Sequence, residues 1–299
     1  MDTSMVKRRI EAQDWLDPVA DAVQGTTKSV IEASGPAGKQ IEDALNGVWL
    51  GHALHPAVTD VPLGAWTVAA ALDAAEAMTG RQDLASGADA AVAIGLAGAL
   101  ASAVTGLTQY YSLSDKPTRR VGAAHALINI SATALYGISY ALRKSGARSA
   151  GRAVGWLGYG VVSAGAYLGG VLVYDQKIGV DHAPRENLPA EFVPVLADTD
   201  LHEATPTKAK AGDIPLVLVR RGDHVFALAD ACSHLGGPLS EGKLEGDCIV
   251  CPWHGSAFQL ADGSVERGPA AAPQPAFETR VNGGQIEVRA NPNLPGNSV

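Results

Sequence analysis

The chain has 299 residues, enough for two domains, and 46% of them are hydrophobic, which indicates that part of the chain lies in lipid. Its 23 basic and 31 acidic residues give a net charge of −8 at pH 7. No basic run alternates with aromatic residues, so the sequence argues against a nucleic-acid partner.

The first 45 residues mix charges with Val, Ile and Leu, and residues 1–45 therefore predict short amphipathic helices on the membrane surface or a partly ordered arm. The opening stretch carries Arg8 and Arg9 but continues into Glu, Gln and Asp. An export signal needs an apolar core after its basic residues, so we expect no cleaved signal here.

Residues 46–180 predict an all-α domain of four transmembrane helices. Four stretches are long enough, at 1.5 Å rise per residue, to cross about 30 Å of hydrocarbon. They are residues 61–78, 90–114, 121–142 and 153–174. The first is the weakest, because Asp73 and Glu76 must lie near the membrane surface or face the bundle. A soluble Ala-rich bundle is the alternative, but its helices would show a charged outer face that these stretches lack.

Residues 181–191 form a polar linker that contains Pro. Residues 192–290 then change to short β runs such as IPLVLVRR and QIEVRA, separated by turn signals that include GD, DG and NGG. This pattern predicts a small all-β domain, followed by a C-terminal tail at residues 291–299.

The β region carries two short clusters of metal-ligating residues, CxH and CxxH. They supply Cys232 with His234, and Cys251 with His254. Two thiolates and two imidazoles could bind zinc, but a zinc finger normally places both Cys in one cluster and both His in the other. One Cys and one His in each cluster instead match a Rieske [2Fe–2S] centre, in which one iron takes both Cys and the other takes both His.

The C-terminal part of the chain resembles a Rieske ferredoxin domain, on the boxes CSHLGGPL and CPWHGSAF and the later segment DGSVERGPA. The resemblance implies one [2Fe–2S] cluster with the four ligands named above and with Gly236, Trp253 and Ser256 around it. The irons of such a cluster have no open coordination position, so the resemblance implies electron transfer rather than catalysis at the cluster. Cytochrome bc-type members add a disulfide between the two loops, but Gly237 and Trp253 stand at those positions here.

The reduction potential follows from the hydrogen bonds that reach the cluster sulfurs. Ser256 keeps a hydroxyl donor, whereas Phe258 stands where the high-potential members carry Tyr. Fewer donors stabilise the reduced cluster less, so we expect a potential below the bc-type range. Among the other metal-ligating residue types, Cys248 is expected to be a small buried apolar residue, and His202 and His224 are expected on the surface.

Four predicted spans put both termini on one side of the membrane, and the Lys and Arg residues of the loops do not decide which side. Iron–sulfur proteins are assembled in the cytoplasm, and the chain shows no twin-arginine signal for folded export. We therefore expect a multi-pass protein of the bacterial cytoplasmic membrane, with the Rieske domain and both termini in the cytoplasm.

Four His residues are expected at the cytoplasmic end of the bundle: His52, His55, His125 and His182. The stretch GHALHPAVTDVPLGAW resembles an uncharacterised family of four-span bacterial membrane proteins that open with an HxxHP box. Facing imidazoles suit a b-type haem, so one hypothesis is a haem with His55 or His52 and His125 as its axial pair. A non-haem metal site is a second hypothesis, and His residues that cap helices and contact lipid headgroups are a third.

The sequence thus predicts a multidomain membrane protein, an all-α four-helix transmembrane bundle followed by a small all-β Rieske domain. We expect it to relay single electrons between a cytoplasmic donor, such as a ferredoxin reductase, and a membrane-associated acceptor, such as a haem or a quinone. Two alternatives are a redox sensor, whose helix packing follows the oxidation state of the cluster, and an electron-supply component of a separate oxygenase.

Overall fold

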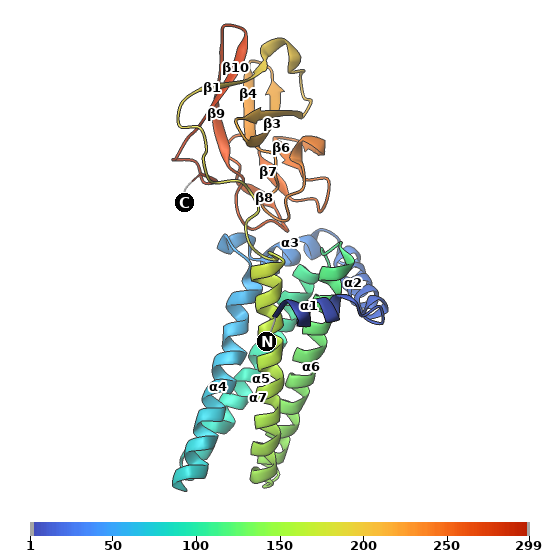
Figure 1. Cartoon of the computed structure of the whole chain (residues 1–299), viewed down its shortest axis with the longest axis vertical. Helices are drawn as coiled ribbons and strands as arrows, with labels where there is room; N and C mark the ends of the chain where they lie inside the picture. The colour runs from blue at the N-terminus through green and yellow to red at the C-terminus, as the bar shows by residue number, and fades with distance from the viewer. Residues whose placement is uncertain (1–2, 298–299) are drawn as a thin grey trace. The chain divides into compact units, whose positions relative to one another are not determined.

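The computed structural model describes residues 3–297 and divides the chain into two compact units (Figure 1). The helical unit contains the residues up to Gly38 together with Leu54–Ile178. The second unit contains Lys39–Ala53 and the chain from Gly179 onward, and it holds all the strands. The bundle is therefore inserted, along the chain, between two parts of the second unit.

Three helices precede the bundle, and a 3₁₀ helix follows them. They are α1 (Thr3–Glu11), α2 (Leu16–Ala33), α3 (Gly35–Asn46) and η1 (Val48–Leu50). Both α1 and α2 pack against α6 (Lys116–Lys144). Leu16 and Ala20 of α2 are buried against Ala123, and Arg120 donates hydrogen bonds of 2.7 and 2.8 Å to the Asp17 carboxylate. An apolar face and a charged contact thus fasten the amphipathic α2 to the bundle.

The bundle consists of four long helices and a final π-helical turn. They are α4 (Leu54–Thr79), α5 (Leu84–Tyr110), α6, α7 (Arg148–Gly170) and η2 (Val171–Asp175). Both α4 and α6 pack against α5 and α7, so α4 and α6 are diagonal partners. At the centre, Trp66 of α4 stacks on Tyr136 of α6 with 4.0 Å between the ring centres. Gly95 of α5 makes room for this pair, because a Cβ there would lie 2.2 Å from Trp66 Nε1.

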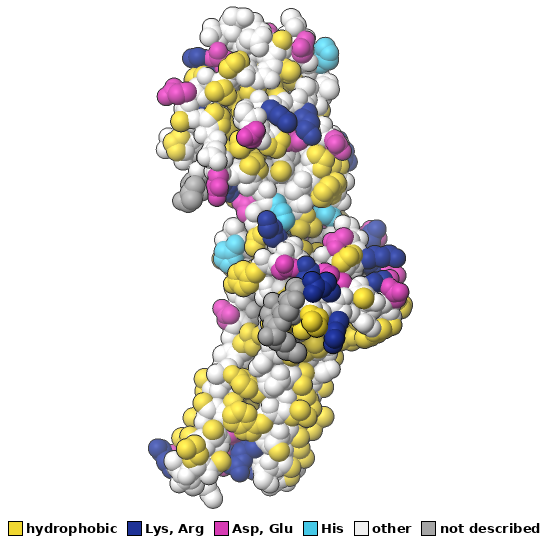
Figure 2. Space-filling view, in the orientation of Figure 1, with side chains coloured by type: hydrophobic (Ala, Val, Ile, Leu, Met, Phe, Trp, Pro, Cys, Tyr) yellow, Lys and Arg dark blue, Asp and Glu magenta, His cyan; other side chains and the backbone are white. Residues whose placement is uncertain are grey.

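Three helices of the described chain are long and apolar enough to cross a membrane: Leu84–Tyr110, Lys116–Lys144 and Arg148–Asp175. The fourth predicted span falls in α4, which carries Asp60, Asp73 and Glu76 and does not meet the same criterion. Figure 2 shows hydrophobic side chains over much of the visible surface of the bundle. Leu100 and Leu157, for example, are 65% and 59% exposed. Such an apolar exterior is typical of helices that face lipid.

A buried network of charges joins the four helices near one end of the bundle. Asp73 of α4 is only 3% exposed and accepts a 2.9 Å hydrogen bond from Arg143 of α6. Arg148 of α7 donates to Glu76 of α4 at 2.7 Å and to Asp89 of α5 at 2.6 Å. Asp73 and Glu76 were expected either near the membrane surface or facing the bundle. The structure shows that both side chains are buried in the bundle. Because each buried charge is paired, the network can hold the helices together.

The second unit contains two antiparallel sheets. The larger has the order β1-β10-β9-β4-β3-β2, with β1 (Val193–Ala197), β2 (Thr207–Ala211), β3 (Ile214–Arg221), β4 (His224–Ala229), β9 (Ala276–Asn282) and β10 (Gln285–Ala290). The smaller has the order β5-β6-β7-β8, with β5 (Lys243–Glu245), β6 (Cys248–Val250), β7 (Ala257–Gln259) and β8 (Val265–Arg267). Val217 and Leu228 of the larger sheet share one core with Ile249 and Phe258 of the smaller. The prediction of an all-β domain after the helices is confirmed.

The charge network predicts a large effect of one substitution. Asp73→Ala would leave the Arg143 guanidinium buried without its main partner, so we expect the free energy of unfolding to fall by about 3–5 kcal/mol. The matched control is Asp83→Ala, which removes the exposed pair between Asp83 and Arg81 and should lower the free energy of unfolding far less. Denaturant unfolding of both variants in detergent checks this prediction, and similar losses in the two variants would contradict it.

Candidate metal centre

Two loops of the second unit carry the four predicted ligands and share one backbone pattern. Cys232 and His234 follow β4, and Cys251 and His254 lie between β6 and β7. In each loop the Cys N–H donates to the carbonyl five residues later, at 2.9 Å for Cys232 and 2.8 Å for Cys251. In each loop the N–H four residues later donates back to the Cys carbonyl, at 2.7 Å and 3.1 Å respectively.

The residue whose N–H donates to the Cys carbonyl is a glycine in both loops, and its backbone has a left-handed conformation. Gly236 has φ +77° and Gly255 has φ +75°. A side chain at either position would be strained, because left-handed backbone is open mainly to Gly. The glycines of the two boxes therefore shape the loops. The sequence predicts Gly236 near the cluster but does not reveal Gly255 as its counterpart in the second loop.

The loops place the two sulfur donors together and the two imidazoles together. The Cys232 and Cys251 thiols hydrogen-bond one another, and these residues are 1% and 4% exposed. The His234 and His254 rings lie beside each other, with 4.9 Å between their centres and 88° between their planes. Two sulfurs on one side and two imidazoles on the other are what a [2Fe–2S] cluster with unlike irons requires.

The ionisation of the donors also suits metal binding. Burial, reinforced by the nearby His254, lowers the pKa of His234 to about 3, so the imidazole is neutral. The hydrogen bond from Cys232 lowers the pKa of Cys251 and favours its thiolate, while the same contact and burial raise the pKa of Cys232. A thiolate and a neutral imidazole are forms that bind metal directly.

A buried atom without a partner tests whether these residues fit a cluster. His234 Nδ1 is buried and has no hydrogen-bond partner, a costly state that a bound iron would relieve. Cys232 and Cys251 form no disulfide and are thus free to bind metal. The donor set therefore fits a [2Fe–2S] cluster, and we propose these four residues as its ligands.

Close packing around the loops leaves little room for substitution. A Cβ at Gly237 would lie 2.9 Å from Cys251 Sγ and 2.9 Å from the Trp253 ring, so this position excludes larger residues. Trp253 is 56% exposed at the rim of the site. Ser256 is fully buried and accepts a 3.0 Å hydrogen bond from Ala270 N–H, which leaves the Ser256 proton available for donation. The aromatic ring of Phe258 is also fully buried.

Gln274, which sequence reasoning missed, fixes the first loop. Its fully buried amide donates to the carbonyls of Ala229 and Ala231 at 2.7 and 2.6 Å and accepts from Ser233 N–H at 3.0 Å. Gln274 lies 40 residues after His234 in a Pro-rich segment, QPAF preceded by AAAP, with no motif that would reveal it. Only the fold brings it beside the loop.

Residues from before and after the bundle also contact this unit's loops. Lys39 Nζ donates to the Gly268 carbonyl at 3.1 Å, and Gly268 N–H donates to Asp43 Oδ1 at 3.0 Å. His182 N–H donates to the Ser233 carbonyl at 3.0 Å, so His182 lies beside the first ligand loop. Residues 39–43 and 182 thus help to order the site although they are remote from it in sequence.

The four His residues expected at one end of the bundle divide between the two units. His55 and His125 lie together in the helical unit, with 6.4 Å between their ring centres. His52 and His182 belong to the second unit. The expectations for the remaining residues are confirmed, because Cys248 is buried and both His202 and His224 are exposed.

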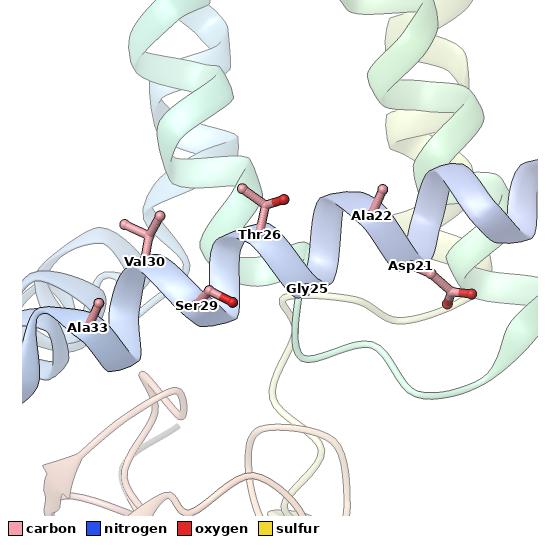
Figure 3. Close-up of a pocket in the computed structure, with 7 residues that line it drawn as sticks. All are labelled: Asp21, Ala22, Gly25, Thr26, Ser29, Val30 and Ala33. Carbon is pink, nitrogen blue, oxygen red and sulfur yellow. The ribbon is translucent and has the colours of Figure 1, made fainter.

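The described chain holds no larger cluster of metal-ligating side chains. Within residues 3–297, no three His, Cys, Asp or Glu side chains are placed to hold one metal ion together. A [2Fe–2S] cluster needs only two protein ligands for each iron. A pocket along α2 is lined by small side chains and one carboxylate (Figure 3): Asp21, Ala22, Gly25, Thr26, Ser29, Val30 and Ala33. Its carboxylate, Asp21, already pairs with Arg119.

Comparison with known families agrees with this site. Residues 191–278 match the Rieske [2Fe-2S] domain, and residues 51–182 match the family described as predicted membrane protein (DUF2231). The chain belongs to the Rieske [2Fe–2S] family through its C-terminal domain, which follows a DUF2231 membrane domain. Membership implies one [2Fe–2S] cluster.

Relatives of the C-terminal domain include a ferredoxin and a dioxygenase ferredoxin subunit. Ferredoxin CarAc of Metapseudomonas resinovorans is 37% identical over 98 residues, which are 32% of this chain and 92% of that protein. The anthranilate 1,2-dioxygenase ferredoxin subunit of Burkholderia cepacia is 35% identical over 99 residues, 33% of this chain and 92% of that protein. A solved complex of reduced oxygenase and oxidized ferredoxin in carbazole 1,9a-dioxygenase is also similar, with 36% sequence identity and a TM-score of 0.31. The match covers 33% of this chain and 92% of that chain. The family match and the two sequence relatives identify the C-terminal domain as a ferredoxin-like electron-transfer domain.

Substitution of the ligands gives a direct test. Cys232→Ser and Cys251→Ser should each reduce bound iron at least tenfold, because each removes a thiolate that no neighbouring side chain replaces. The matched control is Cys248→Ser, a change at a buried Cys of β6, which should keep its iron. Iron analysis and electron paramagnetic resonance of the reduced proteins check the outcome. Equal iron loss in the Cys248 variant, or zinc in place of iron in the unaltered protein, would contradict the assignment.

Proposed function

We propose that the protein is a membrane-anchored Rieske electron carrier that relays single electrons between a cytoplasmic donor, such as a ferredoxin reductase, and a membrane-associated acceptor. The observation that carries this proposal is the separation of two sulfurs from two imidazoles by two matching loops. When bound there, a [2Fe–2S] cluster supplies one-electron redox chemistry. The protein contributes the ligands, their ionisation state and the exclusion of water from the sulfurs.

The two sides of the site differ in their access to partners. Cys232 and Cys251 are buried, whereas His234 and His254 are partly exposed and Trp253 is exposed beside them. Electron tunnelling is favoured through the side with the least intervening protein, so we infer that redox partners dock at the imidazole side. Gly237, Ser256 and Gln274 are buried around the loops that carry the Cys pair.

The membrane part of the proposal rests on the DUF2231 match and on the three apolar helices. We propose that α4 is the fourth span, because it packs along α5 and its buried acids Asp73 and Glu76 are neutralised by arginines. Four spans return the chain to its starting side. We propose that this side is the cytoplasm, where iron–sulfur clusters are assembled.

Electron supply to a separate oxygenase is the second candidate function. It is favoured by the relatives, since one is named as a ferredoxin and another as the ferredoxin subunit of a dioxygenase. Under this alternative the membrane helices would hold the carrier near its oxygenase. The two candidates share the donor and differ in the acceptor.

The acceptor can be identified by reoxidation kinetics of the full chain in liposomes. After reduction by NADH and a ferredoxin reductase, we expect a quinone in the bilayer to reoxidise the cluster within seconds, because the carrier and its acceptor share the membrane. The Cys232→Ser variant, which should lack the cluster, provides the blank. Slow reoxidation by quinone, together with rapid turnover of an added aromatic-ring dioxygenase component, would favour the second function instead.

The hydrogen bonds around the site predict the reduction potential. We expect a value in the lower half of the range of roughly −150 to +300 mV that Rieske centres cover, because Phe258 offers no hydroxyl. Ser256→Ala should lower the potential further by removing a buried donor, and Phe258→Tyr should raise it. Ser264→Ala, in the turn before β8, is the control and should leave the potential unchanged. Redox titration checks all four proteins, and a bc-type value in the unaltered protein would refute the expectation.

A further inference from the structure

Two His residues meet inside the helical unit, far in sequence from the iron–sulfur ligands. His55 is in the first turn of α4, and His125 is in α6. These helices are diagonal partners, so side chains that they direct inward meet in the interior of the bundle. The two imidazole rings have 6.4 Å between their centres and 84° between their planes.

Hydrogen bonds fix which nitrogen of each ring carries the proton. His55 Nδ1 lies 2.9 Å from the Ser102 carbonyl, and His125 Nδ1 lies 3.0 Å from the Gly165 carbonyl. A carbonyl can only accept, so each Nδ1–H is the donor and each neutral ring keeps its lone pair on Nε2. Thr105 Oγ1 lies 3.2 Å from His55 Nδ1 as well. Metal-ligating His residues are held in this way, with the other ring nitrogen donating to a carbonyl.

The spacing of the rings can be compared with the spacing in two kinds of metal site. With metal–nitrogen bonds of about 2.0 Å, two imidazoles on opposite sides of one metal have ring centres about 6.3 Å apart, whereas a tetrahedral angle brings the centres to about 5.2 Å. The observed 6.4 Å agrees with binding from opposite sides. Two axial imidazoles on opposite faces of a flat macrocycle have this relation.

The neighbouring helices present backbone to the rings where larger residues would project side chains. A Cβ at Gly106 of α5 would lie 2.9 Å from His55 Cε1, and one at Gly169 of α7 would lie 3.3 Å from His125 Cε1. The Asn129 amide nitrogen is 3.3 Å from His125 Nε2, but its shorter bond, 2.8 Å, goes to the His125 carbonyl. A metal at Nε2 would therefore displace only the longer of these Asn129 contacts.

We propose that His55 and His125 are the axial ligands of one b-type haem in the helical unit. All the contacts that define this site lie within the helical unit. Its use as the membrane-associated acceptor rests on the proposed function. An iron porphyrin is favoured over a single divalent ion, because two ligands on opposite sides leave the remaining positions of a metal to the macrocycle.

The test uses the full chain, produced with haem precursor and purified in detergent. Pyridine haemochrome assay should give about one haem per chain, and the reduced spectrum should be that of a low-spin, bis-imidazole haem. His55→Ala and His125→Ala should each lower haem content at least tenfold. His52→Ala and the exposed His202→Ala are matched controls that should retain haem.

Cluster content separates misfolding from loss of a ligand. The cluster signal should persist in the His55 and His125 variants, and the Cys232→Ser variant should keep haem without a cluster. If a variant fails to express, titration of haemin into the unaltered protein, with the Soret band as readout, provides the second measurement. Absence of haem uptake in the unaltered protein would overturn the proposal. So would equal haem loss in the His52 variant, or stoichiometric zinc that disappears in the His125 variant.

Discussion

The constraint on which this structure depends is the need to present two sulfurs and two imidazoles as separate pairs. Two loops with the same hydrogen-bond pattern meet it, and each closes through a left-handed glycine, Gly236 or Gly255. Because the Cys pair is buried and the His pair is partly exposed, the donor set has a protected side and an accessible side. Burial of the thiols also requires tight neighbours, which explains a glycine at position 237.

In the helical unit, the question is which interactions fix the arrangement of the helices. Its outer surface is apolar, so contact with lipid cannot by itself select one helix arrangement. The specific interactions are instead interior and polar or aromatic: the Asp73–Arg143 pair, the Trp66–Tyr136 stack and the His55–His125 pair. All three link α4 with α6, the helices that do not share a long packing interface. Diagonal contacts of this kind fix the geometry of the bundle interior, where a flat cofactor would bind.

Local patterns were enough to predict much of this organisation. The ligand boxes have a fixed spacing within each loop, so they revealed the site, and alternating β runs revealed the second domain. Gln274 and the contacts of Lys39 and Asp43 with Gly268 escaped detection, because they are set by tertiary contacts across as many as 229 residues. Among the four His of the membrane region, sequence alone left open whether His52 or His55 meets His125. The fold separates them, since only His55 shares a unit with His125.

The segment Lys39–Ala53 gives the chain an unusual order of assembly. It belongs to the same compact unit as the strands, yet the ribosome makes it before the entire bundle. Lys39 and Asp43 bind the backbone of Gly268, which is synthesised more than two hundred residues later. These contacts therefore cannot form before then. A fragment that starts at Gly179 lacks residues 39–53 of this unit. The complete unit can thus form only after all the helices of the bundle have been synthesised.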